Sequence, residues 1–158
     1  MEAAEWAEQK VEQVQAKREA DALRDRLSLK RLELRESHFP ELAQAAFDAF
    51  HRGCEEYNKR RLLGEPSIGF HVSRRISILK RDAGWSEIWV ERNRATLSLR
   101  IRAHRCSFRF DRTYRPEPLA DGSVVLLRLE TQSLASPDGV AQEAIGAFLD
   151  GKELGERL

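Results

Sequence analysis

Residues 86–102, SEIWVERNRATLSLRIR, decide the fold because apolar and polar positions alternate along them. Ile88 and Val90 fall between the polar or amphipathic neighbours at 87, 89 and 91, and the same period of two recurs from Leu97 to Ile101. This period is typical of a β-strand that buries one face. Arg92-Asn93-Arg94 lies where a hairpin turn is expected. The stretch therefore predicts two antiparallel strands.

The period of two continues on both sides of this hairpin, from Ile68 to about Gln132. Asp121-Gly122 is the strongest turn signal in this part of the chain. Beyond Ala103 the apolar parity shifts by one, which indicates either a tight turn at His104-Arg105 or a β-bulge. We expect an antiparallel sheet of four or five strands.

Two helices are expected to accompany the sheet. Over residues 40–62 the apolar side chains fall within one broad arc at 100° per residue, which is typical of a core-facing helix. Gly64 and Pro66 follow it, as they commonly follow a helix end. Ser136-Pro137-Asp138 marks the start of a short C-terminal helix. The predicted class is α+β, with an amphipathic core helix packed on a curved antiparallel sheet.

Residues 2–36 contain neither glycine nor proline and predict one long helix, separated from the core helix by a break at Ser37-His38-Phe39-Pro40. At 1.5 Å per residue it would span about 52 Å. The remaining domain should have a radius of gyration near ~13 Å. We therefore divide the chain into an extended helix, residues 1–36, for oligomerisation or partner docking, and an α+β domain, residues 37–158.

Apolar residues form two narrow stripes on opposite sides of this long helix. One stripe contains Ala7, Val11, Val14, Leu29 and Leu32. The other contains Ala16, Ala20, Leu23, Leu27 and Leu34, in steps of four and three that Lys30 interrupts. Two stripes suit a helix held between two surfaces. The predicted partner-binding residues are Val11, Val14, Leu23, Leu27, Leu29, Leu32 and Leu34. The alternative is a solvated helix with incidental leucines.

Positive charge is concentrated in the predicted sheet, although the whole chain has a net charge of only +1. Residues 66–115 carry 12 basic and 4 acidic side chains. Arginines with an aromatic ring among them could follow a phosphate backbone while the ring stacks on a base. The polyanion-binding candidates are Arg75, Trp89, Arg100, Arg102 and Arg109. The alternative is a polar outer face neutralised by cross-strand pairing with Glu87, Glu91, Asp111 and Glu130.

Several classes of function are not expected. No apolar run approaches the ~20 residues that a membrane span needs, and the acidic N-terminus does not resemble a secretory signal. Only Cys54 and Cys106 are present, and no phosphate-binding loop, nucleophile elbow or metal-ligand spacing occurs. We expect a cytoplasmic protein without membrane association, cofactor, metal or catalytic activity.

These patterns predict a non-catalytic assembly subunit that self-associates or docks a protein partner through its N-terminal helix. The alternative is an accessory protein that binds single-stranded DNA or RNA with the Arg/Trp face of its sheet.

Overall fold

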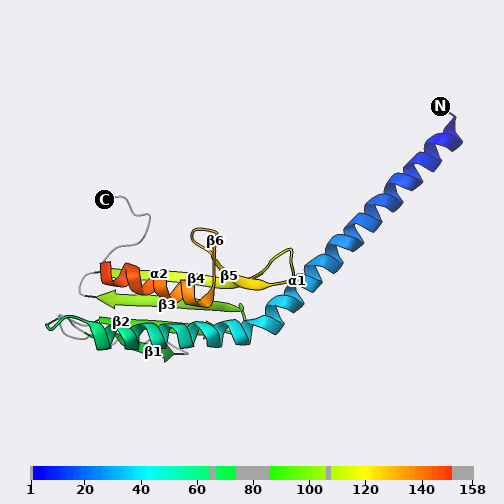
Figure 1. Cartoon of the computed structure of the whole chain (residues 1–158). Helices are drawn as coiled ribbons and strands as arrows, with labels where there is room; N and C mark the ends of the chain where they lie inside the picture. Colours follow the sequence, from blue (N-terminus) through cyan, green and yellow to red (C-terminus); the bar gives the residue numbers. More distant parts are fainter. Residues whose placement is uncertain (1, 65–66, 74–85, 106–107, 151–158) are drawn as a thin grey trace. The chain divides into compact units, whose positions relative to one another are not determined.

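Within the residues that it describes, the computed structural model contains two helices and six strands (Figure 1). It describes residues 2–64, 67–73, 86–105 and 108–150, and the side chains of all these except 71–73, 86, 104–105 and 108–109. The elements are α1 (Ala3–Arg60), β1 (Gly69–Ser73), β2 (Ser86–Asn93), β3 (Ser98–Arg105), β4 (Phe108–Pro118), β5 (Val124–Arg128), β6 (Ser133–Ala135) and α2 (Pro137–Asp150). The predicted α+β class, with its long N-terminal and short C-terminal helices, is confirmed.

The helix α1 is continuous, so the predicted break at Ser37–Pro40 is wrong. Pro40 lacks an amide hydrogen and removes one hydrogen bond from the helix interior. However, Pro40 is exposed, so water can bind the helix carbonyl that loses its amide partner. The neighbouring Phe39 is buried, which holds this part of the helix against the core. The chain divides into two compact units, Met1–Leu34 and Arg35–Leu158, and α1 runs through both.

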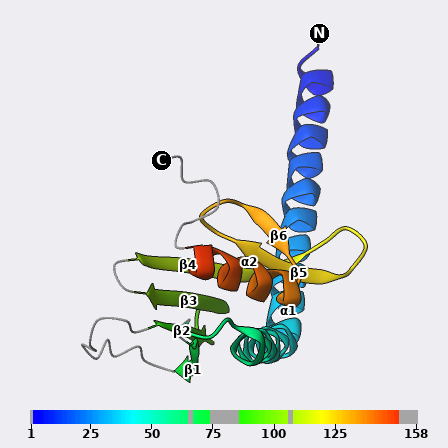
Figure 2. The ribbon, with the colours of Figure 1, turned by 60° about the vertical axis from the view of Figure 1, so that its left-hand side comes forward.

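The six strands form one sheet in sequence order, with β1 and β6 at opposite edges (Figure 2). The pairs from β2 to β6 are antiparallel, whereas β1 pairs with β2 in parallel. The sheet therefore has more strands than expected and departs from a pure meander at its first strand. Residues 74–85, which belong to the stretch from Ile68 to about Gln132 predicted to form the sheet, lie outside the described residues.

The pairing of β3 with β4 settles the parity shift seen in the sequence. His104 and Arg105 lie within β3, where they pair with Arg109 and Phe108 of β4, so the predicted tight turn at His104-Arg105 is wrong. The pairing is continuous from Leu99 to Arg105 and shows no bulge in these described residues. The predicted turn at Asp121-Gly122 is present, with Gly122 at a φ of 86°. A side chain is strained at such a positive φ, which explains the glycine.

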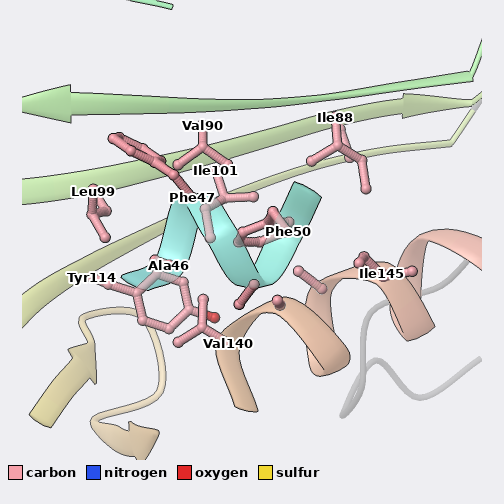
Figure 3. Close-up of a cluster of buried hydrophobic side chains, with 14 of the residues drawn as sticks. Ala46, Phe47, Phe50, Ile88, Val90, Leu99, Ile101, Tyr114, Val140 and Ile145 are labelled. Carbon is pink, nitrogen blue, oxygen red and sulfur yellow. The ribbon is translucent and has the colours of Figure 1, made fainter. Parts of the chain in front are cut away.

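One hydrophobic core joins the second half of α1, one face of the sheet and α2 (Figure 3). Phe50 of α1 and Phe148 of α2 are fully buried, as are Ile88, Val90, Leu99 and Ile101 of the sheet. Phe50 also stacks on Phe70 of β1, with ring centroids 5.9 Å apart. Ile88, Val90, Leu99 and Ile101 therefore point inward as predicted. Leu97 lies outside β3, in the turn at residues 94–97 with a φ of 50°, so the hairpin turn lies later than the predicted Arg92-Asn93-Arg94.

The two helices approach each other closely at Gly53. A β-carbon built on Gly53 would lie 2.6 Å from Cδ1 of Ile145 in α2, so only a hydrogen fits without moving Ile145. An ion pair of 3.2 Å between Arg52 and Asp138 joins the same two helices at the surface. At the end of α1, the Asn58 side chain donates to the Ile68 carbonyl at 3.0 Å and accepts from the Ile68 amide at 2.8 Å.

The burial of Phe50 gives a first prediction. Phe50→Ala leaves a cavity between α1 and the sheet, and it should lower the free energy of unfolding by about 3–5 kcal/mol. Asp48→Ala is the control on the exposed side of the same helix turn and should cost less than about 0.5 kcal/mol. Urea denaturation followed by circular dichroism measures both, and equal shifts for the two variants would contradict the assigned core face.

Candidate functional site

The N-terminal part of α1 is a helix whose side chains are all in solvent. Every residue from Glu2 to Glu33 is exposed. The large apolar side chains among them are Trp6, Val11, Val14, Leu23, Leu27, Leu29 and Leu32, with exposed fractions from 44 % to 65 %. Isolated apolar residues on a surface are ordinary, but seven on one helix form an unusual concentration.

The structure describes each of the predicted partner-binding residues. Val11 and Val14 line a shallow apolar hollow together with Lys10, Gln15 and Arg18. Leu34 differs from the others because it is half-buried, and it ends the exposed stretch. Trp6 was not among the predicted residues. It lies two heptads before Ala20, so the spacing of the second stripe could have included it.

The second candidate surface is the polar face of the central strands, called here the outer face: Glu87, Trp89 and Glu91 of β2, Arg100 and Arg102 of β3, and Asp111 and Thr113 of β4. The strand register sets two cross-strand rows on it. In one row Trp89, Arg102 and Asp111 follow each other, and in the next Glu91 is followed by Arg100 and Thr113. The sheet thus brings Trp89, Arg100 and Arg102 together, as predicted.

The two arginines of the outer face share one carboxylate. Nε of Arg100 donates to Oδ1 of Asp111 at 3.0 Å, and its Nη2 lies 2.5 Å from Oδ2. Nε of Arg102 lies 3.6 Å from the same Oδ2. The hydrogen bond to Asp111 also raises the pKa of Arg100 above its usual value. Asp111 therefore compensates much of the positive charge that these arginines would offer to a polyanion.

Beside this ion pair the sheet is hollowed. A volume of about 520 Å³ is lined by Glu91, Asn93, Ser98, Arg100, Asp111, Thr113 and Glu130, all polar. Glu130 accepts a hydrogen bond of 2.7 Å from the Thr113 amide. With three carboxylates against one guanidinium group, the hollow favours hydrogen-bond donors over phosphate. Within the described part of the chain, no three histidine, cysteine or acidic side chains gather closely enough to hold a metal ion.

Two described arginines of the basic region, Arg92 and Arg112, do not lie on the outer face. Arg75 lies outside the described residues, and so does the side chain of Arg109, whose backbone pairs with His104. Arg92 points to the helix-covered face, 5.9 Å from the ring centre of Phe47. Arg112 of β4 is fully buried, 4.9 Å from the ring centre of Phe110. The period of two continues from Phe110 to Tyr114, and this pattern could have predicted that Arg112 points to the inner face of the sheet.

The core also holds two ionisable groups whose burial decides their chemistry. Cys54 is 3 % exposed, and desolvation raises the pKa of its thiol to about 12. A thiol needs to ionise to act as a nucleophile, so Cys54 is inert at neutral pH. Burial likewise raises the pKa of Tyr114, an effect that neighbouring Arg112 partly offsets.

Comparison with known proteins adds no functional information. A scan against protein-family models found no match, and neither did searches of curated proteins and of solved structures. Neither helix in the described residues has the combination of length and apolarity needed to cross a membrane.

The shared carboxylate gives a second prediction. Asp111→Asn should make the outer face more positive and strengthen its binding to a single-stranded oligonucleotide at low salt, because phosphate contacts release counterions. Arg100→Ala with Arg102→Ala should weaken the binding and flatten its salt dependence by about two units. Fluorescence polarisation at two salt concentrations measures both effects. Indistinguishable titrations of all three proteins would rule out the outer face as a polyanion site.

A third prediction concerns the thiol of Cys54. In a Cys106→Ser background, Cys54 should react with a disulfide reagent only as fast as the protein unfolds, because the thiol is buried and protonated. The sign of the pKa shift also predicts that stability falls as pH rises above about 9, where the thiol ionises only in the unfolded state. Cys54→Ala should remove the part of this stability loss at high pH that Cys54 causes. Rapid modification of Cys54 in the native protein would contradict a buried, protonated thiol.

Proposed function

We propose that this protein is an assembly subunit that docks another polypeptide through the exposed helix of residues 3–33. The observation that carries the proposal is the uninterrupted exposure of this helix together with its large apolar side chains, such as Trp6, Val11 and Leu29. The domain that follows has its own core, formed within residues 35–158. The exposed helix is therefore not needed to complete that core.

The energetics of an exposed helix support docking. Helices owe most of their stability in proteins to packing of an apolar face, and this one packs none of its leucines. Each square ångström of apolar surface that a partner removes from water stabilises the complex by about 25 cal/mol. Because Leu23 and Leu27 lie on one side of the helix and Leu29 and Leu32 on the other, two surfaces can be covered.

Binding of single-stranded nucleic acid is the second candidate function. It is supported by the position of Trp89 directly opposite Arg102, which would place a stacking ring beside a phosphate contact. The pairing of Arg100 and Arg102 with Asp111 makes it the weaker candidate. Docking through the helix requires no such rearrangement of charge.

Three double variants of the full chain test the docking proposal. Leu23→Gln with Leu27→Gln removes one apolar side, and Leu29→Gln with Leu32→Gln removes the other. Glu8→Gln with Ser28→Gln is the matched control, since it changes two exposed positions that lie between the two apolar stripes and outside the hollow at Val11 and Val14. Sedimentation velocity measures self-association, and capture from native extract, with and without nuclease, measures binding to other proteins.

We expect the Leu23/Leu27 variant to lose association that the control retains. All three variants should keep the urea midpoint of the parent protein, since exposed substitutions change stability by less than about 0.5 kcal/mol. If both leucine variants associate and capture proteins as the control does, the exposed helix is not the docking surface.

A further inference from the structure

We propose that the partner of the exposed helix is a second copy of this chain, paired in parallel and in register as a two-stranded coiled coil. This inference rests on the proposed function and names the occupant of one of the two apolar sides. It is argued from the heptad positions of the helix between Glu5 and Leu34 and from the charges that flank them.

The second apolar stripe defines the heptad. Ala20, Leu27 and Leu34 occupy position a, and Ala16 and Leu23 occupy position d. Extending this register towards the N-terminus places Trp6 at position a, where its ring is 55 % exposed. Gln9, Gln13 and Lys30 fill the remaining core positions. Polar residues at such positions lower the stability of a coiled coil but fix its register.

The charges beside this stripe are divided by position. All four e positions are basic: Lys10, Lys17, Arg24 and Arg31. Four of the five g positions are acidic: Glu5, Glu12, Glu19 and Glu33, with Arg26 as the exception. Side chains at e and g flank the apolar seam of a coiled coil and determine the choice and orientation of its partner.

This division favours a parallel pair over an antiparallel one. In a parallel pair, each g residue faces the e residue five positions later on the other helix. Glu5 then faces Lys10, Glu12 faces Lys17 and Glu19 faces Arg24, and only Arg26 with Arg31 is repulsive. In an antiparallel pair e faces e and g faces g, so like charges would meet along both sides of the seam.

The pattern is not explained by pairing within one helix. Residues five apart are about 140° apart around a helix axis and do not face each other. The helix dipole does not explain it either, because its effect is confined to the first and last turns, and α1 continues to Arg60. Val11, Val14, Leu29 and Leu32 fall at outer heptad positions, so the pair would leave the first stripe accessible.

Charge reversal in the full chain tests the pairing. Glu5→Lys, Glu12→Lys and Glu19→Lys make all four e positions and four of the five g positions basic, and the dissociation constant of the dimer should rise at least tenfold. Adding Lys10→Glu, Lys17→Glu and Arg24→Glu to the same chain restores opposite charges and should restore the dimer. Sedimentation equilibrium over a range of concentrations measures all three proteins, and unchanged association of the first variant would overturn the proposal.

Disulfide formation tests the direction. With Cys106→Ser as background, Gln9→Cys at position d should oxidise to a covalent dimer, because the two residues 9 meet in a parallel pair. Gln15→Cys is the matched control at an outer position of the same helix and should remain monomeric. Equal oxidation of the two variants, or none at residue 9, would overturn the parallel pairing.

The failure of this inference can be told apart from failure of the proposed function. A wild-type chain that is monomeric at every concentration overturns the self-pairing. If the leucine variants then still lose protein capture that the Glu8/Ser28 control retains, the docking function stands with a different partner. If they do not, both are overturned.

Discussion

The contact of Phe47 and Phe50 with the inner face of the sheet is the interaction on which the rest of the domain depends. It buries the second half of α1 against Val90 and Ile101 and so decides which side of every central strand faces the core. The same contact also positions α2, which packs on the same face of the sheet, because Gly53, between Phe50 and the end of α1, lets α2 approach α1 closely. A displacement of the second half of α1 would therefore expose the inner face of the sheet and also displace α2.

Fixing the inner face also determines the character of the outer one. Residues at alternate positions must point away from Phe47, and these are mainly charged: Glu91, Arg100, Arg102 and Asp111. Because the strands bring acids of β2 and β4 beside the bases of β3, neutralisation occurs within the sheet. A count of charges along the chain cannot reveal this, since it does not record which strand lies next to which.

The sequence predicted those parts of the fold that depend on local periodicity. Three such features follow from residues close together in the sequence, and all are present: the alternation around Ile88 and Ile101, the arc of Phe47 and Phe50, and the turn at Gly122. Three features depend on tertiary contacts instead. Burial of Phe39 outweighs Pro40 as a helix breaker, β1 pairs in parallel, and Arg112 is taken into the core. For the candidate site, the stripes were visible in the sequence, and cross-strand pairing with Asp111 was the predicted alternative to an open basic face. The strand register adds that this one carboxylate serves both Arg100 and Arg102.

The continuity of α1 has a consequence for how its exposed part forms. Nucleation is the costly step in helix formation, because several residues lose conformational freedom before the first hydrogen bond forms. Extension of an existing helix adds one hydrogen bond for each residue that is fixed. The turns held by Phe39, Ala43 and Phe47 are already built when the domain folds. The preceding residues therefore need only propagate that helix towards the N-terminus, without a nucleus of their own. The folded domain thus supplies the helix nucleus, and the apolar stripes are helical without a partner.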